Sequence, residues 1–181
     1  HLGAACGVGR TQGYRLECRI IGRGPQQADL EALIAAASLG DIVSLRGALS
    51  HEAVVDHYRQ ATMVVLPCVR TADGDVDGIP NVLVEAMALG VPVVSSDLPA
   101  IRELITDGVD GLLVPAGDVA RLAAAVRRLL DEPQLRHRLG GEARRTVVER
   151  FDVEKNVRML ADTLWPGLAK GRQTLSAGRS R

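Results

Sequence analysis

Aromatic residues are scarce in this chain. Its 181 residues include two tyrosines, one phenylalanine and one tryptophan. Surfaces that bind single-stranded nucleic acid stack the bases on several aromatic rings, so this class of protein is disfavoured. Basic and acidic side chains balance at 22 each, and no large positive field is present to attract a phosphate backbone. We therefore expect no nucleic-acid partner.

Cysteine is also sparse, at Cys6, Cys18 and Cys68. The odd number and the absence of C-x-x-C spacing disfavour a zinc site and a disulfide framework, so we expect no bound metal. No apolar run approaches the roughly 18 residues of a membrane-spanning helix, and the first residues lack a signal-peptide layout. These features predict a cytoplasmic protein, with a peripheral position at the inner face of the membrane as a variant of that location.

Short apolar runs alternate with longer segments of helical period. The predicted strands cover residues 16–21, 42–45, 63–66, 91–94 and 112–114, and the predicted helices cover 26–38, 52–60, 81–89, 100–105, 119–130, 133–150 and 153–168. Strands this apolar are typical of parallel sheets that are buried on both faces. The alternation predicts a doubly wound α/β fold in one domain, residues 1–168, followed by a disordered tail, 169–181. In such folds, ligands bind beyond the carboxyl ends of the strands.

One such loop runs directly into a helix, and its sequence from Thr71 to Gly90 is TADGDVDGIPNVLVEAMALG. Gly78 permits a tight turn, and Pro80 is expected at the first helical position, where its missing N–H costs nothing. The first turn of a helix presents unpaired N–H groups and the positive end of the dipole. This segment therefore predicts an anion site that fits a diphosphate.

Two carboxylates flank that helix start. A helical side chain leans toward the N-terminus, so Glu85 is able to reach the opening and accept hydrogen bonds from the vicinal hydroxyls of a ribose. Asp77 precedes the helix and would face the opposite end of the same ligand. A solvated acidic loop and a surface glutamate are the simpler interpretation. However, the helix is otherwise almost entirely apolar, and a glutamate in such a helix requires a partner. The pattern favours a nucleotide sugar.

Two long stretches resemble the donor-binding domain of glycosyltransferase family 4, in which an acidic residue, seven others and a glutamate frame the donor site. They are ADGDVDGIPNVLVEAMALGVPVVSSDLPAIRELITDGVDGLLVPAGD (residues 72–118) and CRIIGRGPQQADLEALIAAASLGDIVSLRGALSHEAVVDHYRQATMVVLPC (residues 18–68). Within the family, the sequence is most similar to exopolysaccharide and colanic-acid-type transferases. The resemblance implies a Rossmann-like C-terminal half of a GT-B fold with a helical C-terminal extension. It also implies a retaining hexosyltransferase that uses a UDP- or GDP-sugar, a glycan or lipid-linked acceptor, and no metal or other cofactor.

The resemblance assigns roles to individual residues. Asp77 would contact the transferred sugar as the catalytic acidic position, where the family usually has glutamate, and Glu85 would hold the ribose. The remaining residues implied in donor binding are Gly22, Gly24, Gly47, Ala48, Leu49, Gly78, Ile79, Pro80, Asn81 and Glu103. For Gly22 and Gly24, a plain strand-to-helix turn is an equally good interpretation, because the third glycine of a dinucleotide motif is missing.

Lysine is almost absent, with Lys155 and Lys170 as the only two. Family members usually carry an arginine and a lysine, after the first strand of this domain, that neutralise the leaving diphosphate. Neither that strand nor that pair is found here, and Arg23 and Arg46 are partial substitutes at best. We therefore expect a chain truncated at its N-terminus, lacking the acceptor-binding domain and inactive alone.

Two alternatives stay open at this point. A sugar-nucleotide epimerase shares the same two-domain fold, although the Asp77–Glu85 signature disfavours it. A non-catalytic nucleotide-binding remnant is favoured by the lack of lysine before position 155. A product assay without acceptor tests the epimerase alternative. A comparison of sugar transfer by this chain with and without its natural upstream sequence separates a fragment from an enzyme.

Overall fold

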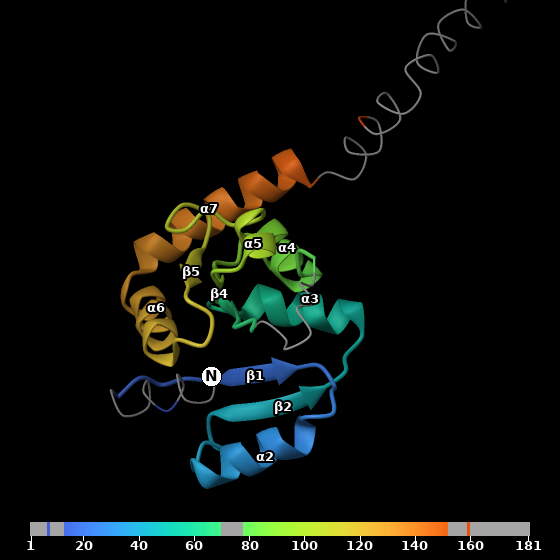
Figure 1. Cartoon of the computed structure of the whole chain (residues 1–181), viewed down its shortest axis with the longest axis vertical. Helices are drawn as coiled ribbons and strands as arrows, with labels where there is room; N and C mark the ends of the chain where they lie inside the picture. Colours follow the sequence, from blue (N-terminus) through green and yellow to red (C-terminus); the bar gives the residue numbers. More distant parts are fainter. Residues whose placement is uncertain (1–6, 8–12, 70–77, 152–158, 160–181) are drawn as a thin grey trace, which may run out of the picture.

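The computed structural model describes residues 7, 13–69, 78–151 and 159. Strands and helices alternate along the chain (Figure 1). The strands are β1 Cys18–Ile21, β2 Val43–Gly47, β3 Val64–Leu66, β4 Val93–Ser96 and β5 Leu112–Val114; the helices are α2 Gln27–Ala36, α3 His51–Gln60, α4 Asn81–Ala88, α5 Pro99–Arg102, α6 Val119–Asp131 and α7 Pro133–Arg150. Of the predicted helix 153–168 only residue 159 is described, and the tail and the domain limits fall on residues outside the described ones.

All strand pairs in the described part of the chain are parallel. β1 pairs with β2 in a two-stranded sheet, and β3, β4 and β5 form a three-stranded sheet in that order. The β1–β2 register shifts between Ile20 and Ile21, so that Ile21 lies opposite Gly47. Parallel strands linked by helices confirm the predicted α/β, Rossmann-like fold class.

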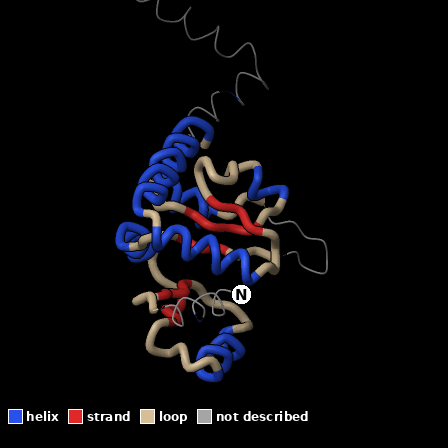
Figure 2. The backbone as a smooth tube through the Cα atoms, turned by 90° about the vertical axis from the view of Figure 1, so that its left-hand side faces the viewer, coloured by secondary structure: helices blue, strands red, loops and turns tan. Residues whose placement is uncertain are grey.

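The three-stranded sheet is buried on both faces, with helices on either side of its strands (Figure 2). Consecutive residues of a strand point to opposite faces, and Val93 and Val94 of β4 accordingly enter two different cores. The core on the Val93 face is built with α3, α4 and α5, and the core on the Val94 face with β5 and α6. Helix α7 contributes Ala143 and Val147 to the first core and Leu135 and Leu139 to the second. It therefore ties the two layers together.

Most predicted elements are confirmed within one or two residues, and α7 has the predicted bounds. Strand β4 is shifted from the predicted 91–94 because it includes Ser95 and Ser96, which are buried. The Ser95 hydroxyl donates to the carbonyl of Leu66 at 2.7 Å, which allows a polar residue inside a buried strand. The short helix α5 ends at Arg102 rather than at the predicted Ile105.

Candidate functional site

Helix α4 begins at the end of the GIP segment. Pro80 is the N-cap, with extended backbone angles φ −67° and ψ 122°, and Asn81 is the first helical residue. The prediction that Pro80 takes the first helical position is therefore wrong by one residue, because its ψ is not helical. Among the described residues no side chain caps this end, and Gly78 and Asn81 are exposed. The N-terminus of α4 is open to solvent, as an anion site requires.

The other end of α4 is fixed. Gly90 has a φ of +74°, a conformation that favours glycine, and the N–H of Val91 donates to the carbonyl of Ala86 at 3.0 Å. Leu83, Ala86 and Met87 have no exposed surface. The core thus holds α4 along its length and leaves the N-terminal turn accessible.

Glu85 lies half-buried on α4 and has a partner from another helix. The hydroxyl of Tyr58 on α3 donates to Glu85 Oε2 at 3.2 Å. Burial raises the pKa of Tyr58 to about 12, and the negative charge of Glu85 and this hydrogen bond act in the same direction. The expectation that a glutamate in an apolar helix requires a partner is confirmed. Tyr58 itself was not predicted, because no sequence pattern links residues 27 positions apart.

The glycine loops after β1 and β2 lie against each other. The N–H of Gly22 donates to the carbonyl of Gly47 at 2.9 Å, and the two residues have φ values of +136° and +66°. Gly24 is exposed in the turn before α2. Ala48 and Leu49 lead from Gly47 into Ser50, whose hydroxyl accepts from the N–H of Ala53 and caps α3.

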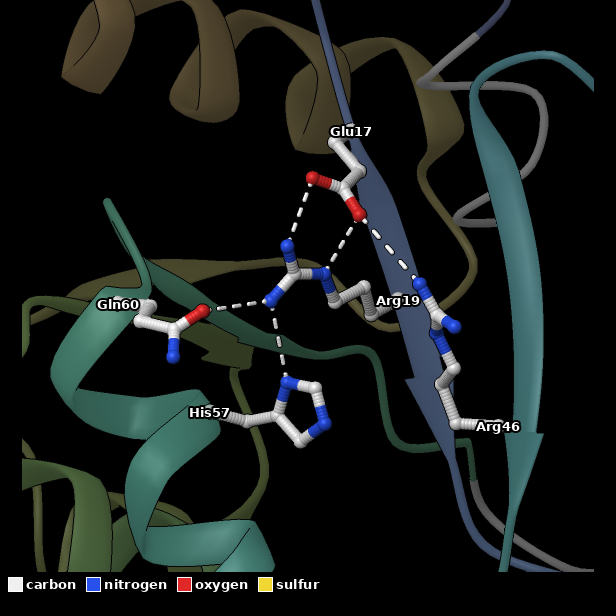
Figure 3. A network of polar contacts seen from close by, with 5 residues as sticks. All are labelled: Glu17, Arg19, Arg46, His57 and Gln60. Carbon is white, nitrogen blue, oxygen red and sulfur yellow. Dashed lines mark hydrogen bonds and ion pairs between the residues drawn. The ribbon is translucent and has the colours of Figure 1, made fainter.

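Two arginines near these loops are occupied by a polar network (Figure 3). Arg19 donates to both carboxylate oxygens of Glu17, at 2.6 and 2.8 Å, and holds the pKa of Glu17 below its ordinary value. Arg19 also donates to Gln60 at 3.1 Å and contacts Nδ1 of His57 at 3.2 Å. A guanidinium only donates, so this His57 nitrogen is the acceptor.

Arg46 belongs to the same network, with Nη2 3.6 Å from Glu17 Oε1. This contact draws its charge toward Glu17. Arg23 is exposed, and its Nε lies 3.7 Å from the position that a Cβ on Gly47 would occupy. The Arg23 side chain therefore lies beside Gly47, whereas the guanidinium of Arg46 lies near Glu17.

The structure brings the predicted site residues together as two groups. Gly22 and Gly47 form one group with their neighbours, and Gly78 to Glu85 form the other. No hydrogen bond or ion pair joins the groups in the ranges 13–69 and 78–151, so their convergence on one ligand stays a prediction. Glu103 is the C-cap residue that follows α5 and is exposed, and its carbonyl accepts a hydrogen bond from Arg150 at 2.7 Å. Asp77 lies outside the described residues.

None of the described helices combines the length and the apolar character needed to cross a membrane. Within the same residues, no group of three or more His, Cys, Asp or Glu side chains has an arrangement suited to a metal ion.

The sequence is similar to those of known proteins. Residues 4–146 match the family model "Glycosyl transferases group 1". The chain is 44% identical over 125 residues to the amylovoran biosynthesis glycosyltransferase AmsK of Erwinia amylovora. The match covers 69% of this chain and 31% of AmsK. It is 35% identical over 162 residues to the putative colanic acid biosynthesis glycosyltransferase WcaL of Salmonella typhimurium, covering 88% of this chain and 40% of WcaL.

Solved structures agree on the fold. The Anabaena protein HepE, solved in complex with UDP-glucose, superposes with a TM-score of 0.76 at 21% identity, over 91% of this chain and 44% of HepE. The chain spans at most two fifths of the length of AmsK and WcaL. With most of its length matched by the family model, the chain belongs to the glycosyl transferases group 1 family.

Proposed function

We propose that this chain is the donor-binding part of a retaining glycosyltransferase that uses a UDP- or GDP-sugar and acts in polysaccharide or glycoconjugate synthesis. The observation that carries the proposal is the open N-terminus of α4 with the half-buried carboxylate of Glu85 one turn inside it. The acceptor is a glycan or a lipid-linked saccharide. The proposal gives no role to a metal ion.

The chemistry of a nucleotide sugar matches the parts of this site. Free N–H groups and the helix dipole favour a diphosphate at the first turn of α4. A carboxylate beside that turn accepts hydrogen bonds from ribose hydroxyls, and we assign this role to Glu85. The proposal places Asp77 toward the transferred sugar. We assign the loops of Gly22 and Gly47, which a backbone hydrogen bond joins, to donor binding, together with Ala48 and Leu49.

Relatives support the choice of donor and pathway. HepE was solved with UDP-glucose, and another solved relative, TarM of S. aureus, with UDP. AmsK and WcaL are named for the biosynthesis of amylovoran and of colanic acid. Sugar transfer needs positively charged protein groups beside the leaving diphosphate, which is an anion. A helix dipole supplies only about half a charge. We therefore assign catalysis to a longer protein and donor binding to this chain.

Nucleotide binding is expected to stabilise the chain in a way that depends on Glu85. UDP or GDP at about 100 times its Kd adds about 2.7 kcal/mol to the free energy of unfolding. The variant Glu85→Gln keeps the size of the side chain and removes the charge, and we expect it to lose most of this shift. Thermal unfolding with and without each nucleotide measures the effect.

Glu149→Gln is the matched control, because Glu149 is an exposed glutamate on α7. This variant should retain the full nucleotide shift. Absence of a shift with both UDP and GDP in the unmodified chain, or equal shifts in the Glu85→Gln and Glu149→Gln variants, would contradict the proposed function.

A further inference from the structure

The hydroxyl of Tyr58 is fixed in space by the core, whereas the side chain of Glu85 has three rotatable bonds. Tyr58 is 6% exposed and packs in the same core cluster as Leu83, Ala86 and Met87 of α4. A buried tyrosine is expected to use its hydroxyl in a hydrogen bond, and here the acceptor is Glu85 Oε2. The contact therefore holds a flexible carboxylate against a rigid support.

This hydrogen bond occupies one oxygen of the carboxylate. In the described part of the chain, Oε1 of Glu85 accepts no hydrogen bond, and no arginine or lysine there forms an ion pair with Glu85. A carboxylate has about four lone-pair sites, so the described residues leave Oε1 and the remaining site on Oε2 to a ligand. The Tyr58 contact thus leaves acceptor capacity on Glu85 and restricts the side chain to one orientation.

We propose that Tyr58 is a positioning residue, which orients Glu85 toward the ribose hydroxyls and thereby lets the site distinguish ribonucleotides from 2′-deoxyribonucleotides. The inference rests on the proposed function, because it assumes that Glu85 accepts from the ribose. Preorganisation explains the effect: without Tyr58, ordering the glutamate would be part of the cost of binding. Tyr58 makes no contact with the ligand in this proposal.

The donor group persists over the whole useful pH range. With the pKa of Tyr58 at about 12, the hydroxyl keeps its proton at neutral pH and donates rather than repels. Discrimination between ribose and deoxyribose is therefore expected to be independent of pH between about 6 and 9 as far as Tyr58 is concerned, since its ordinary pKa of 10 is already above that range.

The test compares Tyr58→Phe with Tyr14→Phe in the full chain. Both variants lose a tyrosine hydroxyl that donates to a carboxylate, but Tyr14 donates to Asp131 at 2.6 Å and not to Glu85. Calorimetric titration with UDP and 2′-deoxy-UDP, and with GDP and 2′-deoxy-GDP, gives for each variant the Kd of the deoxyribonucleotide divided by the Kd of the ribonucleotide. We expect Tyr58→Phe to reduce this ratio by about tenfold, the value of one hydrogen bond to a charged group. Tyr14→Phe should leave it unchanged.

A purely structural role predicts a different pattern, in which Tyr58→Phe weakens the binding of ribo- and deoxyribonucleotides equally. That result, or an unchanged ratio, overturns the proposal. If Glu85→Gln abolishes the discrimination while Tyr58→Phe preserves it, the proposed function stands and the role of Tyr58 falls. If the unmodified chain binds none of the nucleotides, both fall together.

A second measurement does not depend on a ligand. The melting temperatures of Tyr58→Phe, Glu85→Met, which removes both acceptor oxygens, and the double variant form a double-mutant cycle. A hydrogen bond between the two side chains predicts a double variant that is less destabilised than the sum of the single ones. Additive effects would show that Tyr58 and Glu85 do not interact, and would overturn the proposal even if nucleotide binding is intact.

Discussion

Replacement of Gly140 by alanine is expected to destabilise the fold by about 3 kcal/mol, at the upper end of the usual range for overpacking. A Cβ on Gly140 would lie 2.1 Å from the carbonyl oxygen of Gly90 and 3.1 Å from its carbonyl carbon. Both contacts are with backbone, and Gly90 is itself held by its left-handed conformation. Helix α7 would therefore have to move away from the end of α4. Equilibrium unfolding in urea measures the loss.

Gly141→Ala is the matched control, one position further along α7. A Cβ there meets nothing within 4 Å, and alanine is a better helix former than glycine by about 1 kcal/mol. The control should be as stable as the unmodified chain or slightly more stable. Equal stability of the two variants would show that the packing of α7 against Gly90 is not the constraint inferred from the backbone contact.

Removal of the Asp110 carboxylate is expected to cost about 3 kcal/mol, as the loss of two hydrogen bonds to a buried charged group. Asp110 is 3% exposed and connects two parts of the fold. Its Oδ1 accepts from the N–H of Thr106 at 2.7 Å, and its Oδ2 accepts from the hydroxyl of Thr146 on α7 at 2.8 Å. In Asp110→Ala, the loop before β5 loses its tie to α7. Urea unfolding measures this effect as well.

Asp110→Asn separates hydrogen bonding from bulk. Its amide oxygen still accepts from Thr106, while its NH₂ group is able to donate to the Thr146 oxygen, so a smaller loss of about 1 kcal/mol is expected. Thr146→Val should cost a similar amount by removing one donor. If Asp110→Ala and Asp110→Asn are equally stable, the hydrogen bonds are not the source of the stabilisation.

Local patterns were sufficient to predict the elements. Apolar runs marked the strands because parallel strands are buried on both faces. The same rule failed at β4, where Ser95 and Ser96 are buried polar residues. Apolar character alone cannot locate the end of this strand, because Ser95 is polar and its hydroxyl forms a hydrogen bond with the neighbouring strand β3.

The candidate site was predictable only in part. The glycine turns and the start of α4 follow from local chemistry, and their residues lie where expected within one position. The contact between Tyr58 and Glu85 and the approach of Gly140 to Gly90 arise from packing between distant segments. In the sequence, Gly140 is only a poor helix former inside a helix. Glycine is required at this position because the fold places the backbone of Gly90 against it.

The two-stranded sheet has a further consequence for local unfolding. Leu39 and Val43 are the buried residues of its core cluster, and α2 contributes no buried residue. The layers around β4 bury far more apolar surface, so the β1–β2 unit is expected to open at lower free energy than the rest. The loops of Gly22 and Gly47 belong to this weaker unit, whereas Glu85 belongs to the stronger one. A ligand that contacts both would slow amide hydrogen exchange mainly in β1 and β2, far more than in α4.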